Sequence, residues 1–216
     1  MRIATWNVER RLGPDSVELL LRVDADVLLL TEPPQDVAMD GYAFTASAAS
    51  MGRGQLYAAV GSRSATVGPL EHLAAPHPAT AAAVIGGTTY VSTVLPWTSA
   101  SGEHWRGSSF TERTLNALDD LRPLLCAEPR LVWGGDWNHT LEGSLQGQTK
   151  AGRQAIEELL AELGLAAPTR AQPRGVHLMT SIDHIAVRGP VLAVEHHSAE
   201  ADGRRLSDHD LYVVTV

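Results

Sequence analysis

Polar residues that follow apolar runs hold most of the side chains that could do chemistry. Asn7 and Glu9 lie two residues apart at the end of the first apolar run. Asp136 and Asn138 repeat that spacing after two glycines, which permit close backbone approach. Residues two apart on an extended chain point to the same side, so each pair presents two polar groups together. Glu32 also ends an apolar run, where a carboxylate must be solvated, paired or bound to a metal ion.

Three further polar residues stand next to predicted strands in the last part of the chain. Asp183 lies at the start of one strand, and Asp208 and His209 precede the last one. Each residue alone has a plain interpretation, since Asp and Asn form turns and single histidines are common on surfaces. Carboxylates, amides and a histidine at successive strand ends are hard to produce by turn chemistry alone. Oxygen ligands of this kind favour a hard divalent cation, Mg²⁺ or Mn²⁺.

The apolar pattern predicts many strands interleaved with a few helices. The predicted strands span residues 3–8, 27–31, 55–60, 81–85, 89–95, 131–133, 182–187, 191–196 and 211–216. The predicted helices span residues 17–22, 111–126 and 152–163. Asp15 and Ser16 are expected to cap the first helix, and Gly164 ends the last. Because the helices are too few for one behind every strand, layered sheets with outer helices fit better than a parallel α/β barrel.

The length of 216 residues predicts one domain, residues 1–216, at roughly 150 residues per domain. The single cysteine, Cys126, excludes an internal disulfide, and we expect it to pack against the fold. No apolar run is long enough to cross a bilayer and no signal peptide is visible. We therefore expect a cytoplasmic protein without membrane insertion, and nothing in the sequence indicates an obligate protein partner.

The charge balance is acidic, with 17 Lys and Arg against 25 Asp and Glu and a net charge of −8. A protein that grips nucleic acid through its phosphates usually carries a basic face, and no basic run is present. This balance argues against tight duplex binding. It does not exclude a nucleic-acid substrate, because acidic metal sites add to the count.

Taken together, these segments resemble the endonuclease/exonuclease/phosphatase superfamily, whose fold is that of deoxyribonuclease I. The resemblance spans nearly the whole chain, and its five short segments occur in family order: Thr5-Trp6-Asn7-Val8-Glu9, Leu30-Thr31-Glu32, Gly134-Gly135-Asp136-Trp137-Asn138, Ser181-Ile182-Asp183-His184 and Ser207-Asp208-His209. The resemblance implies a four-layered α/β sandwich, in which two mixed β-sheets lie face to face and helices flank them.

The resemblance also implies a metal site. Glu32 resembles the family's main metal ligand, and Asn7 is expected beside it. Glu9 matches an acidic position that some members use at a second or shared metal site, and Asp208 resembles a further ligand. The implied cofactor is Mg²⁺ or Mn²⁺.

The remaining matched residues imply a role in catalysis. Asp136 resembles the residue that orients or deprotonates the attacking water, and Asn138 the one that holds that aspartate or a phosphate oxygen. Asp183 resembles the partner that fixes the imidazole of His209. His209 would then contact the phosphoryl oxygens or share in proton transfer. The implied reaction is in-line attack of water on phosphorus.

One position departs from the family pattern. Many members carry a His or Tyr near the end of the central strand, where this chain has Val94. A packed valine cannot transfer a proton to a leaving group. The loop 97–109 follows this strand, and its Trp97, His104 and Arg106 are candidates for substrate binding. His104 could also replace the missing donor, and the plain alternative is that the loop only covers a sheet edge.

We therefore predict a metal-dependent hydrolase of phosphodiesters or phosphomonoesters, most similar to a nuclease. DNA or RNA is the expected substrate, and the net acidity favours a single-stranded or small one. Two alternatives stay open: a small-molecule or lipid phosphatase, and a non-catalytic binding module that keeps the fold and has lost turnover.

Overall fold

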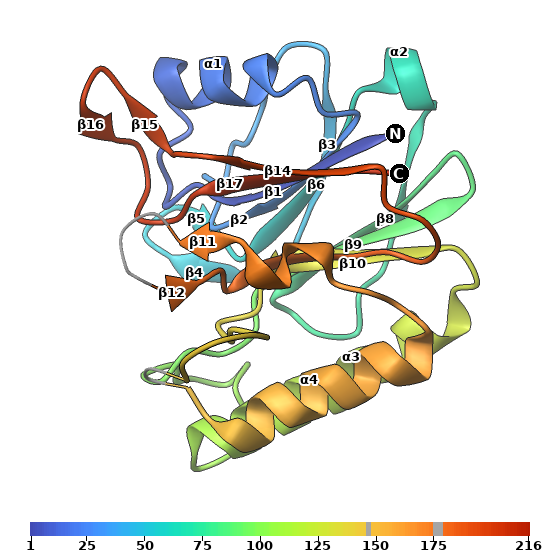
Figure 1. Ribbon diagram of the computed structural model, residues 1–216, viewed down its shortest axis with the longest axis vertical. Coiled ribbons are helices and arrows are strands. Elements are labelled where there is room, and N and C mark those ends of the chain that lie inside the picture. The colour runs from blue at the N-terminus through green and yellow to red at the C-terminus, as the bar shows by residue number, and fades with distance from the viewer. Residues whose placement is uncertain (146–147, 175–178) are drawn as a thin grey trace.

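Four layers make up the computed structural model, which describes residues 1–145, 148–174 and 179–216. Helix α1 (Pro14–Arg22) covers one side of a six-stranded sheet. A five-stranded sheet packs on the other side, and helices α3 (Phe110–Ala127) and α4 (Lys150–Leu163) cover its outer face (Figure 1). The expected sandwich of two mixed sheets flanked by helices is confirmed. Within the described ranges, no helix is long and apolar enough to cross a membrane.

Each sheet contains one parallel pair among antiparallel neighbours. The six-stranded sheet has the order β14 (Ala193–His197), β17 (Leu211–Thr215), β1 (Arg2–Asn7), β2 (Val27–Thr31), β6 (Ala58–Ser62), β3 (Ala43–Ala46). The five-stranded sheet has the order β13 (Asp183–Ala186), β10 (Leu131–Asp136), β9 (Thr88–Thr93), β8 (Thr80–Ile85), β7 (Leu70–Leu73). Strands β1 and β2 are parallel, as are β9 and β10. Parallel strands end at the same sheet edge, which gathers the polar residues that follow them.

Smaller elements lie at the margins of the two sheets. They are β4 (Ser50–Gly52), β5 (Gln55–Leu56), α2 (Ser64–Val67), the 3₁₀ helix η1 (Pro168–Ala171), β11 (Pro173–Arg174), β12 (Met179–Thr180), β15 (Glu200–Ala201) and β16 (Arg204–Arg205). The pairs β4–β5, β11–β12 and β15–β16 are two-stranded antiparallel sheets.

Strand β2 shows why its sequence is an uninterrupted apolar run. Val27 and Leu29 pack into the core between the two sheets, while Leu28 and Leu30 pack into the core beneath α1. All four side chains are fully buried. Successive residues of a strand face opposite sides, so a strand in the middle of four layers must be apolar at every position. Burial of each such side chain contributes about 1.5–3 kcal/mol.

Helix α3 is defined at its start by its own side chains. The Ser109 hydroxyl accepts a hydrogen bond from the Glu112 amide, and the Glu112 carboxylate accepts one from the Ser109 amide, which forms a capping box. Leu118 and Leu121 on the inner face are buried against the five-stranded sheet. Cys126 is exposed, which corrects the expectation that it packs inside.

The N-cap of helix α1 lies two residues before Asp15, the first of its expected caps. Gly13 is the N-cap and Pro14 occupies the first turn, so Asp15 and Ser16 lie inside the helix. Proline is well suited to this place because it has no amide hydrogen to leave unpaired and its φ is already helical. Gly164 caps the C-terminal end of helix α4 in the left-handed conformation, as expected.

Two glycines allow β10 to carry Asp136 into the middle of the molecule. A Cβ atom on Gly134 would lie 2.6 Å from the His184 carbonyl oxygen. Gly135 has a φ of +118°, and a Cβ there would lie 2.3 Å from the Thr93 carbonyl oxygen. Both distances are too short for any side chain, so only glycine permits this approach of the backbones.

We predict that Gly135→Ala lowers the free energy of unfolding by about 2 kcal/mol or more, because both the backbone conformation and the space oppose a side chain. Denaturant unfolding measures the loss. Gly102→Ala is the matched control, since Gly102 has a φ of +105° but no atom within 4 Å of the added Cβ. Equal losses in the two variants would contradict the steric part of this argument.

Candidate active site

The ends of β1, β2 and β10 bring three polar side chains together across the two sheets. Asn7 lies opposite Thr31 in the parallel register, and Glu32 follows directly. The side-chain nitrogen of Asn7, Nδ2, donates to Glu32 Oε1 at 3.0 Å and to Asp136 Oδ2 at 3.1 Å. Asn7 belongs to the six-stranded sheet and Asp136 to the five-stranded sheet. One amide therefore joins two carboxylates that come from different sheets.

Glu32 is held on its other side by a residue that the sequence analysis did not single out. The Gln55 amide nitrogen donates to Glu32 Oε2, and Gln55 is buried. The Glu32 backbone has a φ of +53°, and its amide donates to the Tyr57 carbonyl oxygen. The only sequence signal for Gln55 was a polar residue at the start of a predicted strand, which occurs in many surface strands.

Asp136, Asp183 and His209 form a buried cluster. Asp136 and Asp183 lie opposite each other on β10 and β13. His209 Nδ1 lies 2.7 Å from Asp183 Oδ2, and His209 Nε2 lies 4.0 Å from Asp136 Oδ2. The three residues are 3%, 0% and 5% exposed, respectively. The expected pairing of Asp183 with His209 is present in this geometry.

Burial and the two carboxylates shift the protonation of this cluster. Burial, together with the charge of Asp183, raises the pKa of Asp136 to about 7. Burial alone would lower the pKa of His209, but the charges of Asp183 and Asp136 outweigh it and raise that pKa to about 9. At neutral pH the metal-free cluster therefore holds an imidazolium ion beside an aspartate that can take up a proton.

The segment that carries His209 is tied to β1. The Trp6 indole N–H donates to the His209 carbonyl oxygen at 3.0 Å. The Ser207 hydroxyl donates to the Asn7 carbonyl oxygen at 2.7 Å and accepts from the His209 amide at 3.1 Å. Trp6 and Ser207 are fully buried, so the imidazole is fixed from both the backbone and the ring.

Asn138 supports the cluster through its backbone. Its amide nitrogen donates to Asp136 Oδ1 at 2.9 Å, and its side-chain nitrogen donates to the Leu95 carbonyl oxygen at 2.9 Å. Its φ of +53° is a left-handed conformation that asparagine tolerates better than most residues. Asn138 thus fixes the orientation of Asp136 and fastens it to the chain just beyond β9.

Two expected metal ligands lie at the margin. Asp208 has a side chain that is 60% exposed, with Oδ1 3.7 Å from His209 Nε2. The Glu9 amide donates to Asn7 Oδ1 at 3.0 Å, but its carboxylate lies 3.6 Å from the Arg11 guanidinium. The structure therefore brings Asp208 beside the cluster and places the Glu9 carboxylate next to an arginine.

The loop 97–109 packs its aromatic residues near Tyr57, whose carbonyl oxygen accepts the hydrogen bond of the Glu32 amide. Trp105 is buried, and its ring lies 5.7 Å from the Tyr57 ring and 5.9 Å from the Trp97 ring. The His104 ring lies 6.0 Å from the Tyr57 ring. Trp105 is thus a core residue, while Trp97 and His104 are partly exposed beside it.

Arg106 of this loop contacts helix α3. Its guanidinium pairs with Asp120 of α3 at 2.5 Å, and its carbonyl oxygen accepts from the Asn116 side chain. No contact joins it to Asp136 or His209 among the residues that the structure describes. Its expected role in substrate binding stays a prediction.

The sequence model of the endonuclease/exonuclease/phosphatase family matches residues 4–209, which includes every segment of this cluster. The chain belongs to the endonuclease/exonuclease/phosphatase family. No curated protein matches it.

Solved structures share the fold of this family member at low sequence identity. The 3′ phosphatase NExo from Neisseria, bound to a product DNA hairpin, is 20% identical with a TM-score of 0.71, covering 100% of this chain and 98% of that one. The endonuclease domain of TRAS1, a telomere-specific non-LTR retrotransposon, is 19% identical with a TM-score of 0.68, covering 99% and 96%. A family protein from Leptotrichia buccalis is 14% identical with a TM-score of 0.66, covering 100% and 99%.

The donor set of this endonuclease/exonuclease/phosphatase family member fits a divalent cation. The carboxylate oxygens of Glu32 and Asp136 converge on the side-chain nitrogen of Asn7, and hard cations prefer carboxylate ligands. One ligand atom from each of Asp136, Asp183 and His209 lies within 4.8 Å of the others. Asp183 Oδ1 is buried without a hydrogen-bond partner in the described part of the chain, which leaves an acceptor available.

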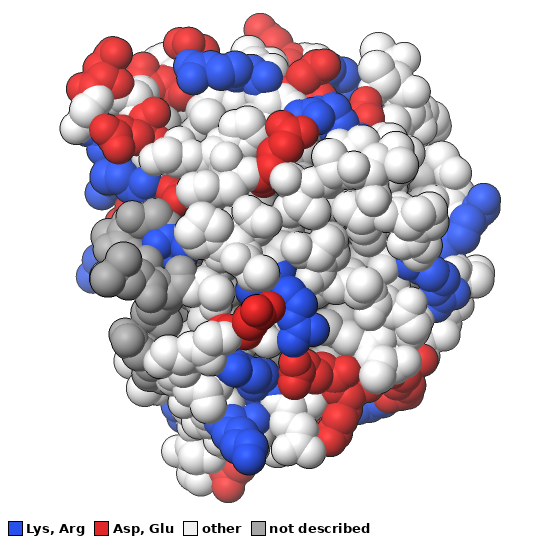
Figure 2. All heavy atoms as spheres, viewed as in Figure 1, with Lys and Arg blue, Asp and Glu red and all other residues white. Residues whose placement is uncertain are grey.

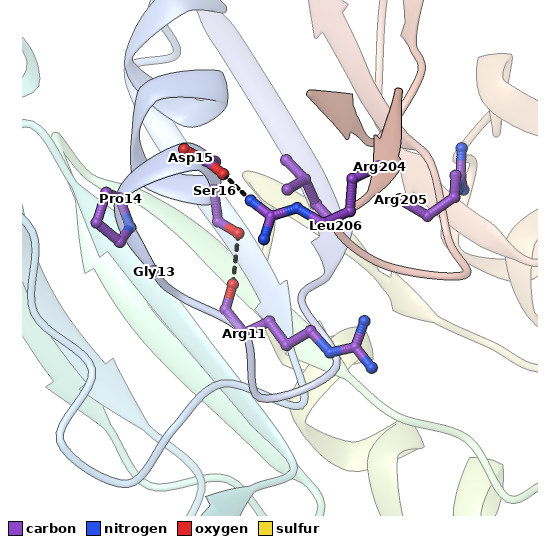
Figure 3. A pocket seen from close by; sticks show the side chains of 8 residues that line it. All are labelled: Arg11, Gly13, Pro14, Asp15, Ser16, Arg204, Arg205 and Leu206. Carbon is purple, nitrogen blue, oxygen red and sulfur yellow. Dashed lines mark hydrogen bonds and ion pairs between the residues drawn. The ribbon is translucent and has the colours of Figure 1, made fainter. Parts of the chain in front are cut away.

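A hollow of about 370 Å³ lies between the start of α1 and the β15–β16 hairpin (Figure 3). Its polar groups satisfy one another: Arg204 pairs with Asp15, and the Ser16 hydroxyl donates to the Arg11 carbonyl oxygen. None of the clustered carboxylates, nor His209, lines it. The hollow is therefore separate from the cluster at the strand ends.

We predict that Asp183→Asn lowers the pKa of His209 in the metal-free protein from about 9 toward the ordinary value of about 6.5. The reason is that the nearest charge favouring the imidazolium form is removed. A titration of the histidine resonances by NMR measures this shift. The resonance of the exposed His72, which is hydrogen-bonded to Thr45, is the internal control. A His209 resonance that titrates as in the wild type would contradict the pairing.

Proposed function

We propose that this family member hydrolyses phosphate esters with a bound divalent cation, Mg²⁺ or Mn²⁺. The observation that carries the proposal is the Asn7 amide, which bonds Glu32 and Asp136 at 3.0 and 3.1 Å. A carboxylate suited to hold a cation thus lies beside one suited to accept a proton. His209, 4.0 Å from Asp136, adds a positive charge on the same cluster.

Glu32, Asn7 and Asp208 would hold the cation, with Glu9 as the further ligand expected from the family. When bound, the cation supplies positive charge that stabilises a phosphoryl group under attack. In this proposal Glu32 keeps its orientation through Gln55, whose amide nitrogen donates to Oε2.

The other residues would handle the water and the phosphoryl oxygens. Asp136 is held at Oδ1 by the Asn138 amide, and in this proposal it orients the attacking water and accepts its proton. Its raised pKa supports this role, because such a base is poised near neutral pH. Asp183 fixes His209 at Nδ1, which directs Nε2 toward a phosphoryl oxygen.

The proposed substrate is a single-stranded or small phosphate ester, with DNA or RNA as the first class to test. The DNA hairpin bound to the Neisseria 3′ phosphatase supports a nucleic-acid substrate. The net charge of −8 and the interspersed charges in Figure 2 favour a small one. On the face shown there, basic and acidic side chains lie in mixed patches, and most of the upper centre is uncharged. A cytoplasmic location remains a prediction from the sequence.

Val94 favours the second candidate, a non-catalytic binding module. It is 1% exposed and packs in the core between the five-stranded sheet and the outer helices. It therefore supplies no proton to a leaving group. A module of this kind would bind a phosphate ester without turning it over.

We predict that the protein hydrolyses bis-p-nitrophenyl phosphate, that a chelator abolishes the reaction, and that Mg²⁺ or Mn²⁺ restores it. Glu32→Gln should lower kcat/KM on the order of 10²-fold or more with little change in the free energy of unfolding. Glu158→Gln on the outer face of α4 is the matched control. No turnover by the wild type with either metal and with DNA, RNA, nucleotide, inositol phosphate and phospholipid substrates would favour the binding module.

We propose further that Trp97, His104 and Arg106 contribute to substrate selection. Arg106→Ala should raise KM about tenfold for an oligonucleotide while KM for bis-p-nitrophenyl phosphate stays unchanged, because only the longer substrate reaches the loop. Arg122→Ala, which removes an ion pair between α3 and α4, is the control. An equal effect on both substrates would indicate that Arg106 acts only through its pair with Asp120.

A further inference from the structure

Arg174 approaches the cluster from an element that the sequence pattern did not reveal. It lies on the two-residue strand β11, next to the 3₁₀ helix η1. One terminal nitrogen of its guanidinium lies 3.2 Å from His209 Nε2. Its side chain is 13% exposed, so the cation is largely withdrawn from water.

The described residues offer the charge of Arg174 little compensation from carboxylates. The ion pair that the described residues provide is a loose one, to Asp208 Oδ2 at 3.9 Å, and the Asp208 side chain is 60% exposed. Arg174 Nε is buried and has no hydrogen-bond partner in the same described ranges. Arg170, four residues earlier, instead bonds Glu157 at 2.8 Å. A buried cation is costly unless an anion accompanies it, and among the described residues the loose pair with Asp208 is the one ion pair of Arg174.

The hydrogen-bonding pattern indicates which kind of partner is missing. His209 Nδ1 faces Asp183 at 2.7 Å and therefore carries a hydrogen. If Nε2 is unprotonated, it accepts from Arg174; if it is protonated, two donors face each other. When Nε2 is unprotonated, Arg174 alone presents N–H groups at this place; when it is protonated, both side chains do. A group with two or more anionic oxygens satisfies both, and Arg binds phosphate oxygens in this manner.

We propose that Arg174 binds a non-bridging oxygen of the substrate's phosphate together with His209. This inference rests on the proposed phosphoesterase function and adds a catalytic residue to it. Arg174 supplies a fixed positive charge beside His209, while Glu32 and Asn7 lie beside Asp136. It needs no proton transfer, because the guanidinium stays charged at any working pH.

The experiment compares Arg174→Ala, Arg174→Lys and the control Arg170→Ala, each first checked for folding by circular dichroism. Hydrolysis of bis-p-nitrophenyl phosphate with Mn²⁺ gives kcat and KM, and inorganic phosphate serves as a competing product. We expect Arg174→Ala to lower kcat/KM on the order of 10²-fold and to weaken inhibition by phosphate about tenfold. Arg174→Lys should recover part of both, free guanidinium ion added at millimolar concentration should partly rescue Arg174→Ala, and Arg170→Ala should match the wild type.

Two outcomes would overturn the inference. The first is an Arg174→Ala variant with wild-type kcat/KM. The second is a loss of activity with unchanged inhibition by phosphate and no rescue by guanidinium, which would show a structural role. If the wild type has no turnover, the proposed function fails, and calorimetric binding of inorganic phosphate then decides the inference alone. Equal phosphate affinity in the wild type and Arg174→Ala would end it.

Discussion

The site depends on one electrostatic constraint: two carboxylates face each other on neighbouring strands inside the protein. Asp136 and Asp183 are opposite in the β10–β13 register, and both are almost completely buried. Two buried like charges destabilise a fold unless a counter-charge or a proton accompanies them. His209 lies between them and provides that charge, which is why its pKa rises even though burial opposes the change. Trp6 then has to hold the chain at His209, so that the imidazole stays where the two carboxylates require it.

The two sheets set the position of this cluster because it lies at their junction. Asn7 comes from one sheet and Asp136 from the other, and the amide between them spans the interface. The spacing of the sheets is fixed by apolar side chains such as Leu29 and Ile185 in the shared core. A change of volume in that core therefore alters the distance between Glu32 and Asp136. The glycines of β10 serve the same end, since they let the strand pass close to its neighbours.

The parts of the fold that the sequence predicted are those with long apolar patterns. Strand β2 matched its predicted bounds, 27–31, and α3 and α4 lay within two residues of theirs. Two-residue strands such as β11 and β15 are too short to show a period, so nothing in the pattern indicated them. Arg174 was missed for this reason. Gln55 was missed because a polar residue at the start of a predicted strand is common, and its contact with Glu32 comes from tertiary position alone. The predicted cap of α1 was wrong because the helix begins before Asp15, with Gly13 as its N-cap and Pro14 in its first turn.

The same topology bears on which half of the proposed reaction the described residues would serve. In that proposal Asp136, Asp183 and His209 meet the water and the phosphoryl oxygens, and Arg174 adds charge beside His209. Val94 packs into the core beneath the outer helices, and a valine side chain has no proton to give. A positioned general acid is worth on the order of 10²–10⁴-fold in rate. In the proposed reaction the described residues would therefore serve attack and charge stabilisation, and the departure of the leaving group would draw on the substrate's own acidity or on a residue of the loop 97–109.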